Sequence, residues 1–331
     1  MKTLWKYGSL PHRTMGVATR EAYGKALVEL GKENPDIVVL DADLSKSTFT
    51  GLFAKAYPDR FFNIGIAEAN LVGIASGMTS FGKIPFISSF AAFLMCKGFD
   101  QLRMTVAYPN HNVKVVTTHA GISIGEDGPS QQSVEDLGLA CSLPNFIVTS
   151  PADDTCARAL VKAAAQHIGP VYIRTGRPKA PKIYDEDESF DLTGARRLSD
   201  GRDVAIVAHG LLVAEAIEAA ERLAKEGIEA TVVDAYCLKP LPEGLLLQVA
   251  EECGAVLVAE EHLLHGGLSA RVAQLYGEKR PTPMAFMGIN DAYAESGKPD
   301  ELMKRYGFSA DKIIENVKAL VSRKPVSVSA R

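Results

Sequence analysis

The chain has 331 residues, a length that suits two domains better than one, and 47% of them are hydrophobic, enough to fill two cores. Its net charge is −4 and its Lys and Arg residues are scattered, which argues against a surface for nucleic acid. With five cysteines but no C-x-x-C pair, no signal peptide and no apolar run long enough for a bilayer, we expect a reduced cytoplasmic protein without membrane partners.

Helices and strands alternate in the first half of the chain. Apolar residues at helical spacing predict a helix over 19–30, and the β-branched run 37–40 predicts a buried strand. The same reasoning predicts helices over 70–81 and 91–107, strands over 84–88, 113–118 and 171–174, and capped helix starts at 133–136 and 150–153. This alternation indicates a parallel sheet with helices on both faces.

Residues 178–202 interrupt the alternation with prolines and an acidic run, and we interpret them as a linker. Beyond it the sequence predicts strands over 204–208, 230–234 and 256–259, and helices over 214–225, 245–252, 268–275 and 312–323. The sequence therefore predicts an α/β protein with two domains, each a mostly parallel sheet covered by helices. The predicted bounds are 1–177 for the first domain, 178–202 for the linker and 203–331 for the second domain.

A single acid, Glu68, stands among Ile, Gly and Ala residues before the predicted helix over 70–81. A carboxylate in such surroundings is costly to ionise, so we expect Glu68 to keep its proton near neutral pH. In that state Glu68 could donate a hydrogen bond to a ring nitrogen and exchange a proton with it. The alternative is an acid at a helix start that only interacts with the helix dipole.

Several polar segments follow predicted strands and would gather at one edge of the sheet, where ligands bind in doubly wound folds. These segments are 43–47, 88–90, 119–132 and 174–177. Each could be structural by itself, because His119 could cap a helix, Phe90 and Phe93 could be core residues, and Arg174 could form a surface ion pair. Segment 125–131 differs, since it holds two acids between glycines and a proline in a turn that no helix or strand needs.

Six sequence segments of the first half resemble the pyrimidine-binding domain of transketolase. They are Ala18-Thr19-Arg20, Asp41-Ala42-Asp43-Leu44-Ser45-Lys46-Ser47, Phe62-Asn63-Ile64-Gly65-Ile66-Ala67-Glu68-Ala69-Asn70, Ser89-Phe90-Ala91-Ala92-Phe93, Phe99-Asp100-Gln101-Leu102-Arg103, and Thr118-His119-Ala120-Gly121 through Gly125-Glu126-Asp127-Gly128-Pro129-Ser130. The second half resembles the transketolase C-terminal domain in type and order, with weaker motifs. The resemblance implies a transferase that moves a two-carbon ketol unit from a ketose phosphate to an aldose in pentose phosphate metabolism.

The resemblance also implies roles for single residues. Thiamine diphosphate would contact Glu68, which faces the N1′ nitrogen of its aminopyrimidine, together with Phe90, Phe93 and Asp43. The residues implied in catalysis are Glu68, His119 and Gln131, the last at a position where the side chain helps in proton transfer. The residues implied in binding the sugar and its phosphate are Arg20, Ser47, His119, Asp127 and Arg174. Arg residues suit a phosphate, and aromatic faces suit a flat ring.

Two departures from the family pattern stand out. Cys96 lies three positions past Phe93, where many family members have an aromatic or basic residue. The Gly-Asp-Gly motif that holds the diphosphate through Mg²⁺ does not occur in the printed sequence, and we expect no metal site in this chain. We therefore expect a second polypeptide, an N-terminal transketolase subunit, to hold Mg²⁺ and the diphosphate in an α2β2 heterotetramer.

Two other functions remain open from the sequence. The first is the beta subunit of a 2-oxo acid dehydrogenase, which has the same domain order, although segment 119–131 suits a sugar better than a small oxo acid. The second is a non-catalytic partner that binds a phosphorylated sugar. The joint presence of Glu68, His119, Asp127 and Arg174 argues against a decayed site. The sequence does not distinguish ordinary pentose phosphates from branched or sulfonated sugars as substrates.

Overall fold

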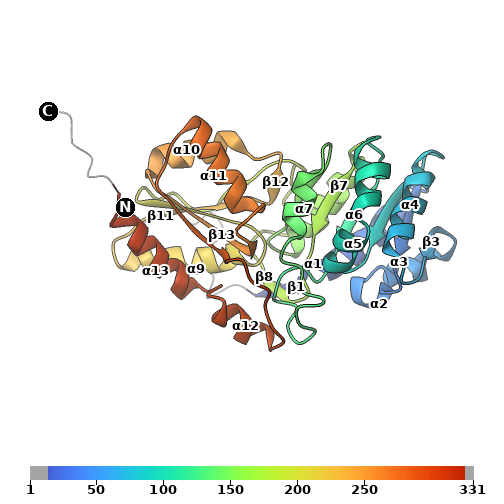
Figure 1. Ribbon diagram of the computed structural model, residues 1–331, viewed down its shortest axis with the longest axis horizontal. Helices are drawn as coiled ribbons and strands as arrows, with labels where there is room; N and C mark the ends of the chain where they lie inside the picture. Colours follow the sequence, from blue (N-terminus) through green and yellow to red (C-terminus); the bar gives the residue numbers. More distant parts are fainter. Residues whose placement is uncertain (1–13, 325–331) are drawn as a thin grey trace.

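The computed structural model describes residues 14–324, which form two lobes side by side, each built on a central sheet (Figure 1). The first lobe holds a seven-stranded sheet of order β12-β6-β7-β5-β4-β2-β3, parallel except for β12. Its strands are β2 (Ile37–Asp41), β3 (Phe61–Asn63), β4 (Ile84–Ser88), β5 (Lys114–Thr117), β6 (Ile147–Thr149), β7 (Val171–Arg174) and β12 (Cys237–Lys239). The predicted α/β class is confirmed.

Helices cover both faces of the first sheet. One face carries α1 (Thr19–Glu33), α3 (Gly51–Ala56) and α8 (Asp154–Gln166). The other face carries α4 (Glu68–Thr79), α5 (Ala91–Lys97), α6 (Phe99–Gln101), the π-helical segment η3 (Leu102–Ala107) and α7 (Asp136–Ser142). The short helices α2 (Ser45–Thr48) and η2 (Pro58–Arg60) lie in the connection between β2 and β3. Strand β2 is buried along its whole length, and its residues 37–40 are apolar on both faces, while Asp41 ends the strand as a buried carboxyl group.

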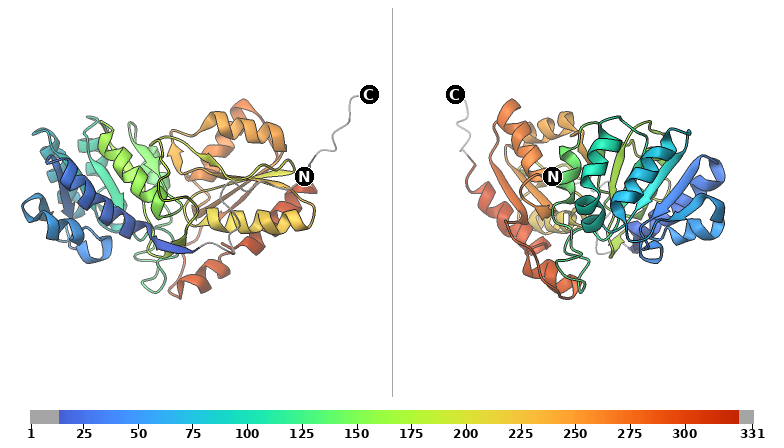
Figure 2. Two further views of the ribbon diagram at one scale, coloured as in Figure 1. Left: turned by 180° about the vertical axis from the view of Figure 1, so that it is seen from behind. Right: turned by 45° about the vertical axis from the view of Figure 1, so that its right-hand side comes forward.

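The second lobe holds a five-stranded sheet of order β14-β13-β10-β11-β9, parallel except for β9. Its strands are β9 (Arg196–Arg197), β10 (Val204–Ala208), β11 (Ala230–Asp234), β13 (Val256–Leu263) and β14 (Met284–Ile289). Its helices are α9 (Leu212–Lys225) and α13 (Ala310–Val321) on one face, α10 (Glu243–Cys253) and α11 (Leu268–Lys279) on the other, and the peripheral α12 (Pro299–Arg305). A small antiparallel pair, β1 (Met15–Ala18) and β8 (Lys179–Pro181), lies between the lobes (Figure 2).

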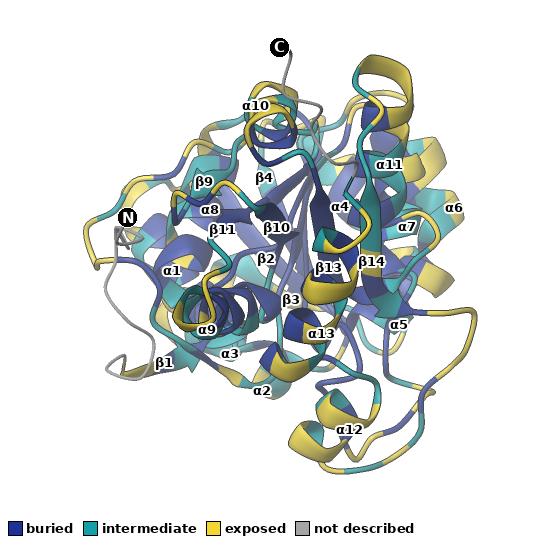
Figure 3. Cartoon of the chain, turned by 90° about the vertical axis from the view of Figure 1, so that its left-hand side faces the viewer, coloured by how far each residue is buried: buried dark blue, intermediate teal, exposed yellow. Residues whose placement is uncertain are grey.

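The two lobes share apolar cores across their boundary. One core contains residues from α4, α5 and α7 together with residues from α10 and α11, and another joins α8 to α9 and α13. Figure 3 shows the strands of both sheets buried beneath helices whose outer surfaces are exposed. Strand β12 of the second half completes the first sheet, and the predicted linker contains β8 and β9. The lobes therefore form one continuous packed unit around the predicted boundary at 178–202.

Three local predictions were wrong. The predicted helix over 91–107 is broken after α5 at Gly98, where a Cβ atom would lie 2.8 Å from the Leu94 carbonyl oxygen. The segment at 133–136 does not cap a helix through Ser133, because α7 begins at Asp136 and the Ser133 hydroxyl has no hydrogen-bond partner among the residues that the structure describes. The helix start predicted at 150–153 is displaced toward the C-terminus, because α8 begins at Asp154 and its cap is Asp153, whose carboxylate accepts from the Cys156 amide at 2.8 Å. Between residues 14 and 324, no helix is long and apolar enough to cross a membrane.

Candidate active site

The candidate site lies at the edge of the first sheet where its parallel strands end. Strand β4 ends before Ser89 and Phe90, strand β5 ends before His119, and a parallel bridge pairs Phe90 with Thr118 beyond both strand ends. Asp41, the last residue of β2, accepts hydrogen bonds from the Leu44 amide at 2.6 Å and from the hydroxyls of two threonines. These bonds fix the loop that follows β2. The strand ends thus gather the predicted polar segments at one edge.

Glu68 is the first residue of α4 and is 3% exposed. The Ser89 hydroxyl donates to its Oε1 at 3.4 Å, and the Lys97 ammonium lies 3.7 Å from its Oε2. The surroundings of Glu68 are therefore not only apolar. Ile66, one of the neighbours expected to shield the acid, is 78% exposed in this chain. The protonation of Glu68 at neutral pH stays a prediction.

Three rings form a stack beside Glu68. The Phe90 and Phe93 rings lie 5.5 Å apart between centroids at an interplanar angle of 20°. The His119 ring stacks on Phe90 at 3.8 Å and 26°. The Lys97 ammonium lies 4.5 Å from the centroid of Phe93. The stack presents aromatic surface on which a flat ligand ring can pack.

His119 is buried and held in one tautomer by its neighbours. Arg20 donates from Nη1 to Nε2 of the imidazole at 3.2 Å, so that nitrogen is the acceptor and the proton resides on Nδ1, which lies 2.7 Å from the Thr118 hydroxyl. Burial, followed by the charges of Arg20 and Arg177, lowers the pKa of His119 to about 3. The ring is therefore neutral at physiological pH and offers hydrogen bonds without a charge of its own.

Two guanidinium groups belong to this cluster. Arg20 donates to the Ser47 carbonyl oxygen at 2.6 Å, while its Nε is buried without a hydrogen-bond partner among the described residues. Arg177 donates to the Ile124 carbonyl oxygen and to Glu126 Oε2 at 3.0 Å. Burial lowers the pKa of Arg20, and the charge of Arg177 lowers it further. Two cations that repel one another at one edge of the sheet form a suitable site for an anion.

Ser47 and Asp43 lie in the loop after β2 and contribute in different ways. Ser47 reaches the cluster only through its main-chain carbonyl, which accepts from Arg20. Asp43 adopts a left-handed conformation with φ of 63° and accepts from the Asn63 amide group at 2.8 Å. Because Asn63 begins the segment that leads to Glu68, this hydrogen bond connects Asp43 to the chain just before that acid.

Asp127 and Gln131 lie farther out on the loop 119–132. Asp127 is exposed, and Gln131 accepts from the Ser130 hydroxyl at 3.2 Å. In the part of the chain that the structure describes, no hydrogen bond joins either side chain to His119. Their predicted roles thus depend on a bound substrate.

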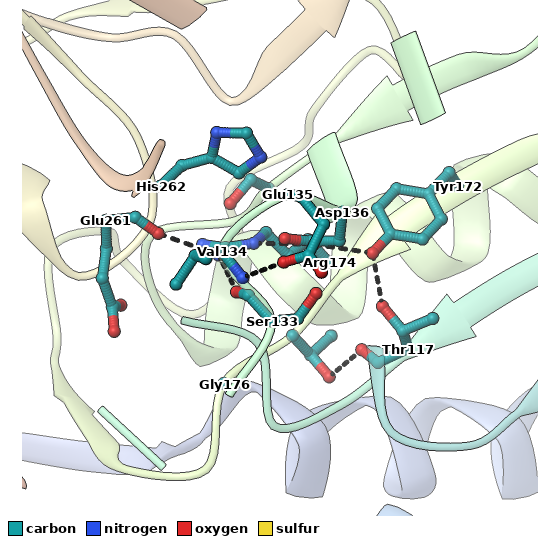
Figure 4. A network of polar contacts seen from close by, with 12 residues as sticks. Thr117, Ser133, Val134, Glu135, Asp136, Tyr172, Arg174, Gly176, Glu261 and His262 are labelled. Atoms are coloured by element: carbon teal, nitrogen blue, oxygen red, sulfur yellow. Dashed lines mark hydrogen bonds and ion pairs between the residues drawn. The ribbon is translucent and has the colours of Figure 1, made fainter. Parts of the chain in front are cut away.

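Arg174 does not lie in this cluster (Figure 4). It is 6% exposed and donates from Nε to Asp136 Oδ2 at 2.9 Å and from Nη2 to the Glu261 carbonyl oxygen at 2.9 Å. The Tyr172 hydroxyl donates to the same Asp136 oxygen at 2.7 Å. In place of the predicted phosphate contact, Arg174 forms a buried ion pair with Asp136 inside the first lobe, and its bond to the Glu261 carbonyl oxygen reaches the second lobe.

Arg177 is the residue that sequence reasoning missed. Strand β7 ends at Arg174, so that residue still points into packed structure, while Arg177 lies in the loop beyond the strand. Segment 174–177 is one of the polar segments predicted at the edge of the sheet. The Thr-Gly pair between its two arginines is the sequence signal that the strand ends there and that only the second arginine lies in the loop. No group of three or more His, Cys, Asp or Glu side chains in residues 14–324 could hold a metal ion.

Comparison with protein families gives two matches that together span most of the chain. Residues 15–182 match the family described as transketolase, pyrimidine binding domain, and residues 194–313 match transketolase, C-terminal domain. The chain is 40% identical over 301 residues to a transketolase C-terminal section from Methanocaldococcus jannaschii, which covers 90% of this chain and 94% of that protein.

Two further relatives differ in length. A 6-deoxy-6-sulfo-D-fructose transketolase subunit from Clostridium sp. (strain MSTE9) is 38% identical over 305 residues, covering 92% of this chain and 95% of that protein. The transketolase of Homo sapiens is 38% identical over 321 residues, covering 95% of this chain and 51% of the human protein. The chain therefore spans about half the length of the human relative.

Two solved structures that are similar to this chain are also described as transketolases. A structure described as split gene transketolase, inactive beta4 tetramer, matches with a TM-score of 0.88 and 50% identity, covering 94% of this chain and 100% of that chain. Transketolase from Campylobacter jejuni matches with a TM-score of 0.78 and 25% identity, covering 95% of this chain and 48% of that chain.

Proposed function

Since this chain belongs to the transketolase family of transferases, we propose that it is one subunit of a two-chain transketolase. The complex would move a two-carbon ketol unit from a ketose phosphate to an aldose. The observation that carries the proposal is the buried carboxyl group of Glu68 beside the Phe90 and Phe93 rings. Both matched regions are described as transketolase, which favours this function over that of a 2-oxo acid dehydrogenase subunit.

The residues around Glu68 fit the aminopyrimidine of thiamine diphosphate, the cofactor that the family implies. Glu68 supplies a buried carboxyl group, and the two phenylalanines supply apolar ring surface. The Lys97 side chain, which lies over Phe93, is 53% exposed and free to move into solvent. When bound, the cofactor supplies carbanion chemistry. Glu68 would hold and exchange a proton at a ring nitrogen, and Asp43 would lie near the same ring.

The cationic cluster supports a site for the sugar phosphate. Arg20 and Arg177 lie on the same edge of the sheet as His119, and the Arg20 Nε has no partner in the described structure. We assign the phosphate to these two arginines, with the Ser47 carbonyl orienting Arg20. The neutral His119 would hydrogen-bond to sugar hydroxyls.

The outer loop completes the proposed substrate site. Asp127, which is exposed, would accept from a sugar hydroxyl, and Gln131 would assist proton transfer. A sulfonate carries one negative charge where a phosphate monoester carries about −1.5 to −2 at pH 7, but both present three acceptor oxygens around a tetrahedral centre, so the arginine pair suits sulfonated ketoses as well.

We assign the diphosphate and Mg²⁺ to an N-terminal transketolase subunit on a second chain, in an α2β2 complex. The relatives of equal length support this, because they are described as a C-terminal section and as a subunit. An exposed apolar face along α4 also supports the assignment to a second chain. Ile66 and Phe81, just beyond its two ends, are 78% and 85% exposed, and a Cβ added at Gly73 or Gly77 between them would have no atom of residues 14–324 within 4 Å. A partner could pack closely against this apolar face.

Reconstitution tests the proposal. The chain alone, a candidate N-terminal subunit alone and their mixture would be assayed for ketol transfer with thiamine diphosphate and Mg²⁺. Donors would include a ketose phosphate, the matching sulfonated ketose and the uncharged ketose. We expect transfer by the mixture only, in a complex whose mass corresponds to two copies of each chain. Ketol transfer by the isolated chain, with no copurifying protein, would refute the proposal that a second chain is required.

A further inference from the structure

The loop 119–132, which carries three of the proposed site residues, has an unusual backbone. His119, Gly121, Gly125 and Gly128 all adopt positive φ angles, of 60°, 80°, 89° and 75°. The left-handed backbone carries a steric cost at His119, whereas the three glycines adopt it without strain but lose much conformational entropy when the loop is fixed. The Gly121 amide donates to the Ser133 carbonyl oxygen at 2.7 Å and closes the loop at its base. Between residues 122 and 132, the main-chain bonds within the loop are short-range turns, such as the bond from the Gly125 amide to the Ile122 carbonyl oxygen. The shape of the loop therefore depends on what packs against it.

The second lobe supplies that support through Glu261, near the end of β13. The Ser123 amide donates to Glu261 Oε1 at 2.6 Å, and the Ser123 hydroxyl donates to Oε2 at 3.3 Å. Any side chain at Gly121 would collide with the same carboxyl group. Glu261 is 5% exposed, and Figure 4 shows its carboxyl group pointing away from Arg174, which binds its main-chain carbonyl instead. The carboxyl group of Glu261 therefore binds the loop and not Arg174.

The segment before α12 holds the outer part of the same loop (Figure 1). Gln132 donates to the Glu295 carbonyl oxygen at 3.1 Å. An added Cβ at Gly125 would lie 2.8 Å from Pro299, and one at Gly128 would collide with Ser296. Each glycine of the loop with positive φ therefore faces a residue of the second lobe that leaves no room for a side chain.

We propose that Glu261 is a positioning residue for the substrate site, through which the second lobe fixes the loop that carries His119, Asp127 and Gln131. This inference rests on the proposed function. The connection is short, because Gly121 and Ser123 lie two and four positions after His119 in the chain. Loss of the Glu261 carboxyl group would release the loop and weaken binding of the donor sugar while leaving the cofactor residues on α4 and α5 in place.

A purely structural role would be to hold the two halves of the chain together, and a second contact between the halves provides the control. Lys239 of β12 donates to the Cys141 carbonyl oxygen at 3.2 Å and also to that of Leu143, away from the loop. Lys239→Met removes a contact between the two halves of the chain without touching residues 119–132. Glu261→Gln is the conservative variant, since its amide oxygen still accepts from the Ser123 amide. Gly121→Ala disturbs the same contact from the loop side if Glu261→Ala does not fold.

Hydrogen–deuterium exchange on the full isolated chain gives the first readout and needs no activity. We expect Glu261→Ala or Gly121→Ala to speed exchange of the amides of residues 121–126 by about 10- to 100-fold, the equivalent of one hydrogen bond to a charged group. Glu261→Gln should restore most of the protection, and Lys239→Met should leave this segment unchanged. Unchanged exchange in Glu261→Ala, or equal acceleration in Lys239→Met, would overturn the proposal.

Steady-state kinetics of the reconstituted complex give the second readout. We expect Glu261→Ala to raise KM for the ketose donor about 10-fold or more, with unchanged affinity for thiamine diphosphate, and Lys239→Met to leave KM unchanged. Faster exchange without a change in KM would overturn the link to substrate binding. If no complex transfers a ketol unit with any variant, the proposed function fails, and the exchange data still decide whether Glu261 holds the loop.

Discussion

The ion pair between Arg174 and Asp136 allows a sharp prediction about stability. Both side chains are buried, at 6% and 0% exposure, so solvent screens their interaction little. Arg174→Ala would leave the Asp136 carboxylate with only the Tyr172 hydroxyl, 2.7 Å away, as a donor. Removal of one partner from a buried pair costs about 3–5 kcal/mol of the free energy of unfolding. We expect a loss in this range.

The pH dependence of that loss follows from the pKa of Asp136. Burial alone would raise this pKa, but the charges of Arg174 and His262 and the hydrogen bonds hold it below its ordinary value. A lowered carboxyl pKa stabilises the fold above the ordinary value near pH 4 and this contribution is lost as the pH falls further. In Arg174→Ala, burial would instead raise the pKa of Asp136, so the variant takes up a proton and regains stability as the pH falls toward about 4. The difference between wild type and variant should therefore be largest at pH 7 and shrink progressively as the pH is lowered.

Urea unfolding of the full chain measures the free energy, and donor kinetics of the reconstituted complex separate the two roles considered for Arg174. A double variant, Arg174→Met with Asp136→Leu, is the matched control, because two apolar residues leave no buried charge, and it should recover most of the loss. We expect Arg174→Ala to affect phosphorylated and uncharged donors alike. A stability loss under about 1 kcal/mol, with KM raised for phosphorylated donors only, would refute this reasoning and restore the phosphate role.

Three further predictions concern other charged groups. Arg177→Ala should raise KM for phosphorylated donors, by up to about 2–5 kcal/mol if the contact is well desolvated, and leave uncharged donors unchanged; equal effects on both donors would contradict this. Burial raises the pKa of Asp234 to about 8. The free energy of unfolding should therefore fall as the pH rises from about 4 to about 8, by up to about 1.4 kcal/mol per pH unit. Urea unfolding at several pH values should show a flatter slope for Asp234→Asn. Because burial and the two arginines lower the pKa of His119 to about 3, an NMR titration should show no imidazole protonation above pH 5, and a midpoint near 6.5 would contradict the observed contacts.

Elements with strong local patterns could be predicted from the sequence. The predicted helix over 19–30 corresponds to α1, and the predicted strand over 204–208 corresponds to β10 with the same bounds. Strands β12 and β14 were not predicted, because β12 has only three residues and β14 lacks alternation between polar and apolar residues. β12 follows a strand of the second lobe in the chain but pairs with β6 of the first lobe, and such pairing depends on contacts between residues far apart in the chain.

The site was predictable up to the point where tertiary structure decides which side chain faces it. Loops after parallel strands had to meet at one edge, and the structure brings Arg20, Phe90 and His119 together there. Arg174 and Arg177 could not be separated by sequence, because which of them is buried depends on where β7 ends and on Asp136 from α7. The support of the loop by Glu261 depends equally on how the two lobes pack.

The role of Glu68 is the central claim of this account, and one variant tests it directly. Glu68→Gln keeps the size of the side chain and a hydrogen-bond donor but cannot exchange a proton with a ring nitrogen. In the reconstituted complex with thiamine diphosphate and Mg²⁺, we expect kcat for ketol transfer to fall roughly 10²–10⁴-fold. Assembly with the partner should remain intact and the free energy of unfolding should change by no more than about 1 kcal/mol. Normal turnover by Glu68→Gln, with or without a loss of stability, would contradict the assignment of this residue and of the site around it.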